Sequence, residues 1–103
     1  MIPVVWVGRS REEVRQLPPR VRHRLGYEVF KLQMGETPGD SRAMPSVGPG
    51  VWEVRVRERG AYRLLYIVDG STAVYVLHAF EKKSRATPRR SIHVARARLR
   101  EIP

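Results

Sequence analysis

Apolar residues recur along this chain at two different spacings, and each spacing predicts one type of element. The run PVVWVG at 3–8 is short, β-branched and aromatic, and a glycine closes it, which predicts a strand. Between 19 and 34 the apolar residues follow a helical period, so we expect an amphipathic helix that ends at Gly35. Its apolar positions are Val21, Leu25, Tyr27, Val29, Phe30 and Leu32.

Two further helices are predicted from the residues at their starts. Ser10 and Glu13 have the spacing of a capping box, so a short helix should begin at Ser10 and end before Pro18. Thr87 is expected to cap a C-terminal helix with Pro88 at its first position. The buried stripe expected for that helix consists of Ile92, Ala95, Leu99 and Ile102.

The second half of the chain has the pattern of an antiparallel meander. The expected strands are 51–57, 62–68 and 73–80, with turns at 58–60 and at Asp69-Gly70. The first of them alternates strictly, which is typical of a strand with one buried and one polar face. Its apolar positions are Trp52, Val54 and Val56, and its polar positions are Glu53, Arg55 and Arg57.

The order of elements predicts an α+β fold in one domain, residues 1–103. We expect an antiparallel-rich sheet with two N-terminal helices packed on one face, followed by a C-terminal helix. The segment 36–50 is rich in Pro, Gly and Ser and should be a loop. If the helices all lie against one sheet face, the other face is open and carries Glu53, Arg55 and Arg57.

Composition narrows the classes of function. The net charge is +10, and from residue 51 onward twelve Lys and Arg face only five Asp and Glu, which indicates a polyanionic partner. There are no cysteines, and the three histidines are not spaced as metal ligands, so we expect no metal and no other cofactor. No run resembles a signal peptide or a membrane span, so a cytoplasmic protein without membrane contact is expected.

Arg63 is the one charged residue within an otherwise apolar strand, so its guanidinium must reach an acid, water or a ligand. Pairing across the 58–60 turn would bring it beside Arg55, where two cations favour an anion between them. The alternative is a salt bridge from Arg63 to Glu53 or Asp69, and an Arg63 sealed against an internal acid would end the case for a site built on these cations.

A metal-free ribonuclease needs a base for the ribose 2′-hydroxyl and cations for the charge that develops on phosphorus. Glu53 or His78 could act as the base. Arg55, Arg63, Lys82 and Lys83 suit charge stabilisation.

The stretch after 80 is strongly basic and leads into the C-terminal helix. Unpaired amides at a helix start attract anions, whereas cations there oppose the helix dipole, so phosphate contacts explain the basic residues better than stability does. Phe80 could stack a base or pack in the core. The expected RNA contacts are Arg57, Phe80, Arg85, Arg89 and Arg90, beside Lys82 and Lys83.

The stretches GVWEVRVRERGAYRLLYIV and VYVLHAFEKKSRATPRRSIHVARARLREI resemble the phage-derived, HigB-like branch of the RelE/ParE toxin superfamily. The elements W-E-x-R, Y-R, H-A-F-x-K-K and T-P, in this order and spacing, carry the resemblance. It implies a RelE-like fold and a type II toxin that cleaves messenger RNA on the ribosome and is neutralised by an antitoxin, usually of the helix-turn-helix type.

The resemblance also implies where the substrate lies. The positions that surround the scissile phosphate in RelE-type nucleases match Glu53, Arg55 and Arg63, and their basic segment matches Lys82, Lys83 and Arg85. Glu53 stands where well-known relatives carry a lysine, and no tyrosine follows Tyr75. Two other functions stay open, namely a non-enzymatic toxin of the same fold that inhibits a target such as gyrase, and a basic nucleic-acid-binding module.

Overall fold

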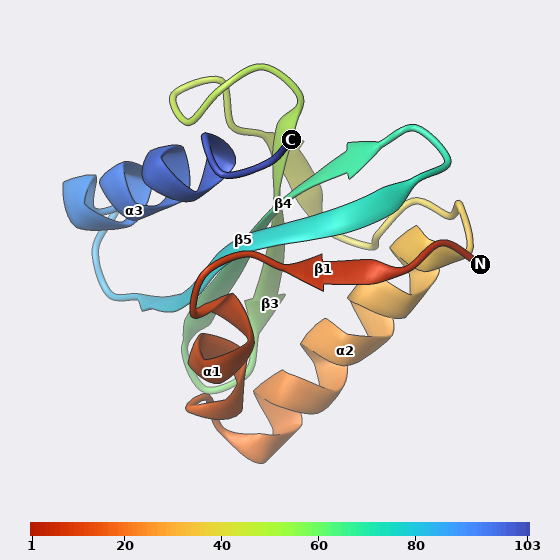
Figure 1. Ribbon diagram of the computed structural model, residues 1–103. Coiled ribbons are helices and arrows are strands. Elements are labelled where there is room, and N and C mark those ends of the chain that lie inside the picture. The colour runs from red at the N-terminus through yellow and green to blue at the C-terminus, as the bar shows by residue number, and fades with distance from the viewer.

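A mixed sheet of five strands runs through the middle of the protein, with helices on both of its faces (Figure 1). The computed structural model covers residues 1–103. Its elements are β1 (Val4–Trp6), α1 (Ser10–Arg15), α2 (Pro19–Gln33), β2 (Ser41–Ala43), β3 (Val51–Arg57), β4 (Ala61–Asp69), β5 (Ala73–Lys82) and α3 (Arg89–Leu99). The prediction of an α+β fold is therefore confirmed.

The strands lie in the order β1-β5-β4-β3-β2, and only β1 runs parallel to its neighbour, β5. The antiparallel meander β3-β4-β5 was predicted, with its central strand β4 at the predicted place. The edge strand β2 lies within 36–50, which was predicted as a loop. Its three residues carry no alternation, and only their pairing with β3 makes them a strand.

The amphipathic helix α2 covers one face of the sheet. Its residues Val21, Leu25, Val29 and Leu32 are buried against Val54, Val56 and other strand residues in a first core, as the helical period predicts. The assignment of two further residues to this apolar face is wrong. Tyr27 and Phe30 are 59% and 46% exposed, because they project from the side of α2 that faces away from the sheet.

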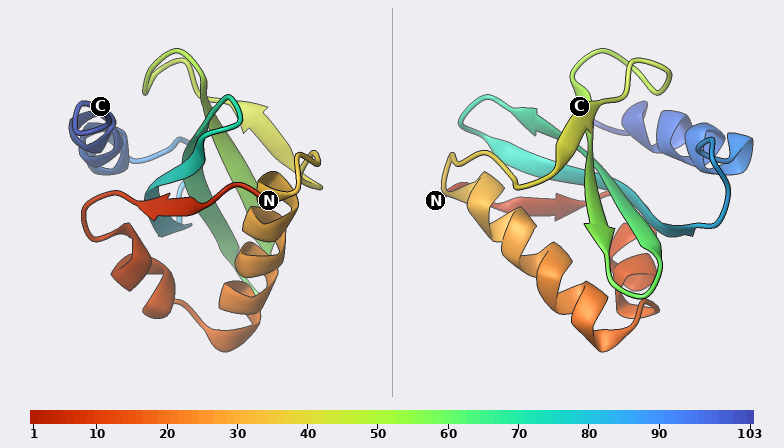
Figure 2. Two further views of the ribbon diagram at one scale, coloured as in Figure 1. Left: turned by 45° about the vertical axis from the view of Figure 1, so that its right-hand side comes forward. Right: turned by 180° about the vertical axis from the view of Figure 1, so that it is seen from behind.

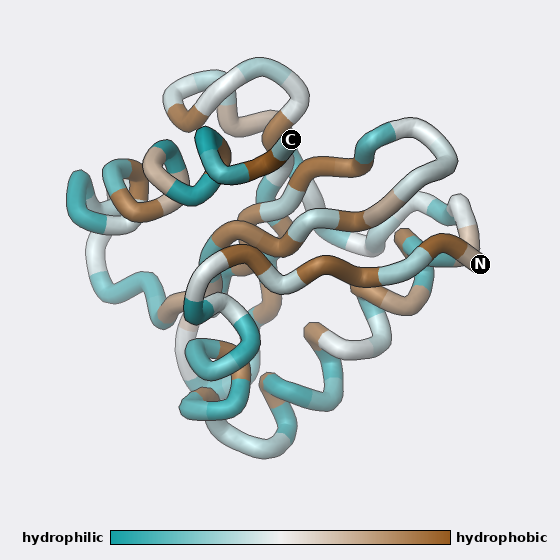
Figure 3. Tube along the Cα trace, viewed as in Figure 1, coloured by the Kyte–Doolittle hydropathy of each residue, from teal (hydrophilic) through white to brown (hydrophobic).

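The C-terminal helix α3 lies on the opposite face, so the expectation that all helices share one face is wrong (Figure 2). Its residue Ala95 is buried in a second core with Leu65, Tyr75 and Leu77, and the expected stripe residues Ile92, Leu99 and Ile102 pack against this core. Figure 3 shows the consequence, with hydrophobic residues concentrated along the central strands that both cores share. No helix combines the length and the apolar composition needed to cross a membrane.

A bulge in β5 changes which residues face α3. Tyr66 pairs with Val76, but the next residue back along β4, Leu65, pairs with His78, so Leu77 is an extra residue. A bulge reverses the alternation beyond it. As a result His78 and every second residue after it lie on the α3 face, whereas unbroken alternation from Val76 would have turned them towards α2.

The helix caps differ from the predicted ones. The N-cap of α1 is Arg9, no side chain caps it, and the hydroxyl of Ser10 is buried without a hydrogen-bond partner. Helix α3 begins at Arg89 after an N-cap at Pro88, and Thr87 does not cap it. The carboxylate of Glu13, predicted to complete a capping box, is bound elsewhere, as described below.

Candidate functional site

The strand register places a row of polar side chains on the α3 face, beyond the edge of the second core. Directly opposite residues project from the same face of a sheet. Arg55 pairs with Arg63, which pairs with Phe80, and in the next row Arg57 pairs with Ala61. The predicted proximity of Arg55 and Arg63 is therefore confirmed.

Asp40 extends this row at the sheet edge. The backbone N–H of Arg55 donates to the Asp40 carbonyl at 2.8 Å, which continues the β2–β3 pairing by one residue. The Arg55 side chain donates from Nε and Nη2 to Oδ1 of Asp40, at 3.0 and 2.7 Å. Backbone and side chain together therefore hold the carboxylate beside the arginines.

A small pocket of about 190 Å³ opens among these side chains. The residues that line it are Asp40, Arg55, Val56, Arg57 and Arg63, and we call it the arginine pocket. Arg57 is exposed and has no ion pair. Arg55 forms an ion pair with Asp40 and with no other acid. Three guanidinium groups against one carboxylate leave the pocket cationic, which suits a phosphate.

Glu53 does not lie on an open face, and the prediction that it does is wrong. Its side chain is 0% exposed, 3.4 Å from Nε of Arg63 and 3.0 Å from Nε of Arg42. The alternative of an internal salt bridge to Glu53 is therefore correct for Arg63, which is 8% exposed. Burial lowers the pKa of Arg63, and the charge of Glu53 opposes that shift. This is the outcome that counts against Arg63 as a free phosphate ligand, so the prediction of a site centred on Arg63 is wrong, and Arg63 lines the pocket only as a supporting charge.

The second candidate base, His78, is 9% exposed and belongs to a hydrogen-bonded group that we call the Glu13 cluster. Its Nδ1 lies 2.8 Å from Oε1 of Glu13, and its Nε2 lies 3.2 Å from the hydroxyl of Ser91. Arg98 donates to both carboxylate oxygens of Glu13, at 2.7 and 2.8 Å. The backbone N–H of Ala79 donates to the same carboxylate. The cluster ties α1, β5 and α3 together.

These contacts perturb Glu13 strongly. Burial alone would raise the pKa of this carboxyl, but hydrogen bonds from His78 and Arg98 outweigh it and lower the pKa from 4.5 to about 2. Because both ring nitrogens of His78 are occupied within the cluster, its contacts are those of a clamp between elements. Phe80 stacks on the His78 ring at 5.0 Å and packs against the second core.

The basic segment divides into structural and free cations. Nζ of Lys82 donates to the carbonyls of Ser84 and Arg85, at 2.7 and 2.6 Å, so this ammonium shapes the loop. Lys83 is 80% exposed and lies 3.9 Å from a Glu81 carboxylate oxygen. The exposed cations without an ion pair at the start of α3 are Arg85, Arg89 and Arg90. They remain available to an anionic ligand.

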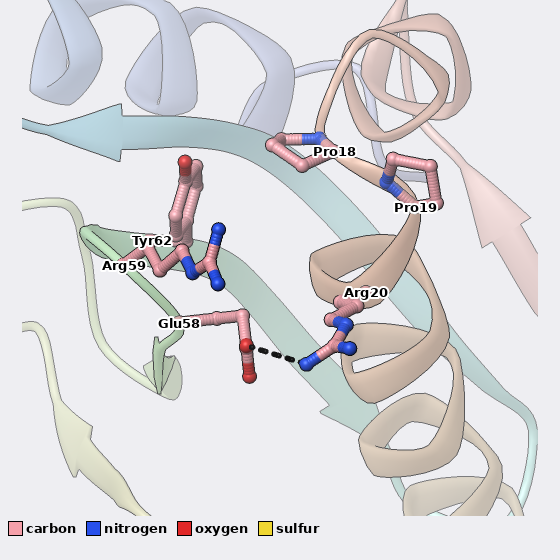
Figure 4. A pocket seen from close by; sticks show the side chains of 6 residues that line it. All are labelled: Pro18, Pro19, Arg20, Glu58, Arg59 and Tyr62. Carbon is pink, nitrogen blue, oxygen red and sulfur yellow. Dashed lines mark ion pairs between the residues drawn. The ribbon is translucent and has the colours of Figure 1, made fainter.

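The largest pocket, about 540 Å³, lies elsewhere, between the start of α2 and the β3–β4 turn (Figure 4). Pro18, Pro19 and Tyr62 form its apolar walls. Its one carboxylate, Glu58, faces Arg20 at 3.6 Å and Arg24 at 3.7 Å. We place the candidate site at the smaller arginine pocket, because three arginines face one carboxylate there, whereas the large pocket has only Arg20 and Arg59 against Glu58. No group of three or more His, Asp or Glu side chains is placed to hold a metal ion.

Sequence reasoning did not find three of the residues that shape these sites. Asp40 lies in a segment without periodicity, and Ser91 and Arg98 were assigned no role on their helix. The one available signal was the spacing of Ser10 and Glu13, which suggested a local cap and not the long-range contacts that Glu13 makes.

Comparison with known families gives one match. The sequence model of a family described as "Phage derived protein Gp49-like (DUF891)" matches residues 12–100. The matched range contains the whole arginine pocket and the whole Glu13 cluster. No curated protein matches the chain.

Proposed function

Because the chain belongs to the Gp49-like family of phage-derived proteins, a RelE-like and often toxin-like family, we propose that it is the toxin of a type II toxin-antitoxin system. We place it in the HigB-like branch, with a RelE-like fold. Its proposed activity is that of an endoribonuclease that cleaves messenger RNA on the ribosome without a metal ion. The observation that carries this proposal is the arginine pocket.

The arginine pocket suits the chemistry of RNA cleavage. Attack of a ribose 2′-oxygen on the adjacent phosphorus builds negative charge on the phosphoryl oxygens, and fixed cations lower the energy of that state. Arg55 and Arg57 can reach such oxygens because they line the pocket and are at least partly exposed. Arg63 adds a third positive charge from below and holds its place through Glu53.

Exposed cations at the start of α3 can hold the rest of the messenger. Arg85, Arg89 and Arg90 are exposed at the start of α3, and Lys83 lies beside them on the same loop. Each phosphate that these cations neutralise releases counterions, so RNA binding should weaken steeply with salt. A helix-turn-helix antitoxin in the cytoplasm completes the proposed system.

The test is a cell-free translation reaction with purified protein and mapping of the transcript ends. We expect cuts in phase with codons, and no cuts in naked messenger. Arg55→Ala together with Arg57→Ala should slow cleavage about 100-fold, a typical loss when fixed charge stabilisation is removed. The matched control is Arg11→Ala with Arg22→Ala, two exposed arginines without ion pairs on α1 and α2. Equal losses in both pairs would mean that general charge, and not the pocket, matters.

One observation favours a second candidate, a toxin that inhibits its target by binding alone. Glu53 is sealed in the interior and both ring nitrogens of His78 are engaged, so neither predicted base is free. Intact messenger in the same reaction, together with gyrase trapped on DNA in a separate assay, would support this candidate and overturn the ribonuclease proposal.

A further inference from the structure

We propose that Asp40 is the general base of the reaction, the group that removes the proton from the attacking ribose 2′-hydroxyl. The inference rests on the proposed ribonuclease function and names a catalytic residue for it. Asp40 is the only carboxylate that lines the arginine pocket. The ligand proposed for the pocket is a ribose-phosphate unit of RNA.

The position of Asp40 is fixed while half of its carboxylate stays free. The backbone bond to Arg55 places Asp40 directly opposite that residue, and hence in the row that continues to Arg63. Arg55 holds Oδ1 through two hydrogen bonds. No protein group donates to Oδ2, and the side chain is 59% exposed. A base must be both held and accessible, and Asp40 meets both conditions.

The other acidic groups near this end of the sheet are held in place but are not accessible to a substrate in the pocket. Glu53 is fully buried between Arg42 and Arg63. Glu13 accepts bonds from His78, Ala79 and Arg98 and stays within its own cluster. Burial therefore closes Glu53 to a substrate, and both oxygens of Glu13 already accept bonds from Arg98.

A phosphate bound by the arginines would bring the 2′-hydroxyl of the preceding ribose to Asp40. The Asp40 carboxylate takes the hydroxyl proton while the 2′-oxygen forms a bond to phosphorus. The bond from phosphorus to the 5′-oxygen breaks, and its electron pair stays on the leaving oxygen. That oxygen takes a proton from water, and Asp40 returns its proton to the solvent. The products are a 2′,3′-cyclic phosphate and a 5′-hydroxyl end.

Asp40→Asn separates this role from a structural one. The amide can still accept a bond from Arg55, but it cannot take a proton, so we expect kcat in the ribosomal reaction to fall at least 100-fold. Removal of a negative charge from among three arginines should also strengthen the attraction of phosphate. We therefore expect KM to stay level or to fall, together with tighter binding of a short RNA in a filter assay.

Two further variants complete the design. Asp40→Glu retains a carboxylate and should recover at least a tenth of the wild-type kcat, which a purely structural ion pair would not require. Asp69→Asn removes an exposed carboxylate at the far end of β4 and should leave kcat unchanged. Circular dichroism checks that every variant is folded.

The outcomes separate the two proposals. If the wild type cuts in phase with codons and Asp40→Asn cuts within threefold of it, Asp40 is not the base and the ribonuclease function stands. A raised KM with unchanged kcat would also overturn the inference, because it would make Asp40 a binding residue. If the wild-type protein leaves the messenger intact, the ribonuclease function fails, and the role of Asp40 fails with it.

Discussion

Removal of the Glu13 charge should lower the free energy of unfolding, and the size of this decrease should depend on pH. Glu13→Gln keeps the size of the side chain and removes its charge, which leaves Arg98 without a counter-ion although that side chain is only 13% exposed. A carboxyl whose pKa falls from 4.5 to about 2 on folding stabilises the folded state at neutral pH. Since each tenfold change in proton affinity corresponds to ~1.4 kcal/mol, the limit is about 3 kcal/mol.

Solvent contact lowers that limit slightly. The Glu13 side chain is 24% exposed, so some of the interaction is screened, and we expect a loss of about 2 to 3 kcal/mol at pH 7. The folded-state pKa lies below the unfolded one, so the contribution is complete above pH 4.5 and disappears as the pH falls through about 2. The difference between wild type and variant should shrink in that window.

Urea denaturation followed by far-ultraviolet circular dichroism at pH 7, 5 and 3 measures both effects. The matched control is Glu12→Gln, a change at the neighbouring position on α1. Glu12 is 44% exposed and its nearest cation, Arg15, is 4.0 Å away, so we expect a change within about 0.5 kcal/mol at every pH. If Glu13→Gln behaves like Glu12→Gln at pH 7, or if its deficit is the same at pH 3, the Glu13 cluster does not act as a clamp.

Three other substitutions test a buried ion pair, the first core and a loop glycine. Arg63→Ala leaves Glu53 with Arg42 as its one remaining counter-ion and should lower the free energy of unfolding in urea by less than the ~3–5 kcal/mol typical of a fully broken buried pair, with partial recovery when Glu53→Gln is added; no recovery would contradict the buried pair. Leu25→Ala, at a side chain 1% exposed, should lose ~2–5 kcal/mol, and a neutral result would place α2 elsewhere. Gly50→Ala should lose ~1–2 kcal/mol in thermal melts, because its φ is +81° and a Cβ there would lie 3.1 Å from Ile67; an unchanged melting temperature would argue against this backbone conformation.

Periodicity made most of the fold predictable. The spacing of buried residues such as Val21 and Leu25 predicts α2, and the alternation around Val54 predicts β3. Both patterns arise because only one side of each element faces the core. The side that α3 covers was not predictable. The apolar stripe of α3 indicates that the helix packs against the protein, but it does not indicate which face of the sheet the helix covers.

The candidate site was predictable only in part. Turn length and register put Arg55 opposite Arg63, which a sequence can reveal through the hairpin. Asp40 enters the site through a backbone bond to Arg55 from a segment without any pattern. Glu13 meets partners 65 and 85 residues away, so its local spacing to Ser10 could not indicate its contacts.

The extra residue in β5 makes that strand two half-strands of opposite phase. Up to Leu77 the strand supplies one set of side chains to the hydrophobic interior, and from His78 onward it supplies a different set to the Glu13 cluster and to the row of residues that contains Arg55 and Arg63. Excision of Leu77 would therefore restore a regular ribbon in which His78 and Phe80 keep their partners Leu65 and Arg63 and stay on the α3 face, and only the Leu77 side chain would be lost from the second core. Homologous chains that lack the extra residue should therefore keep the same side chains on each face of the sheet on both sides of this point.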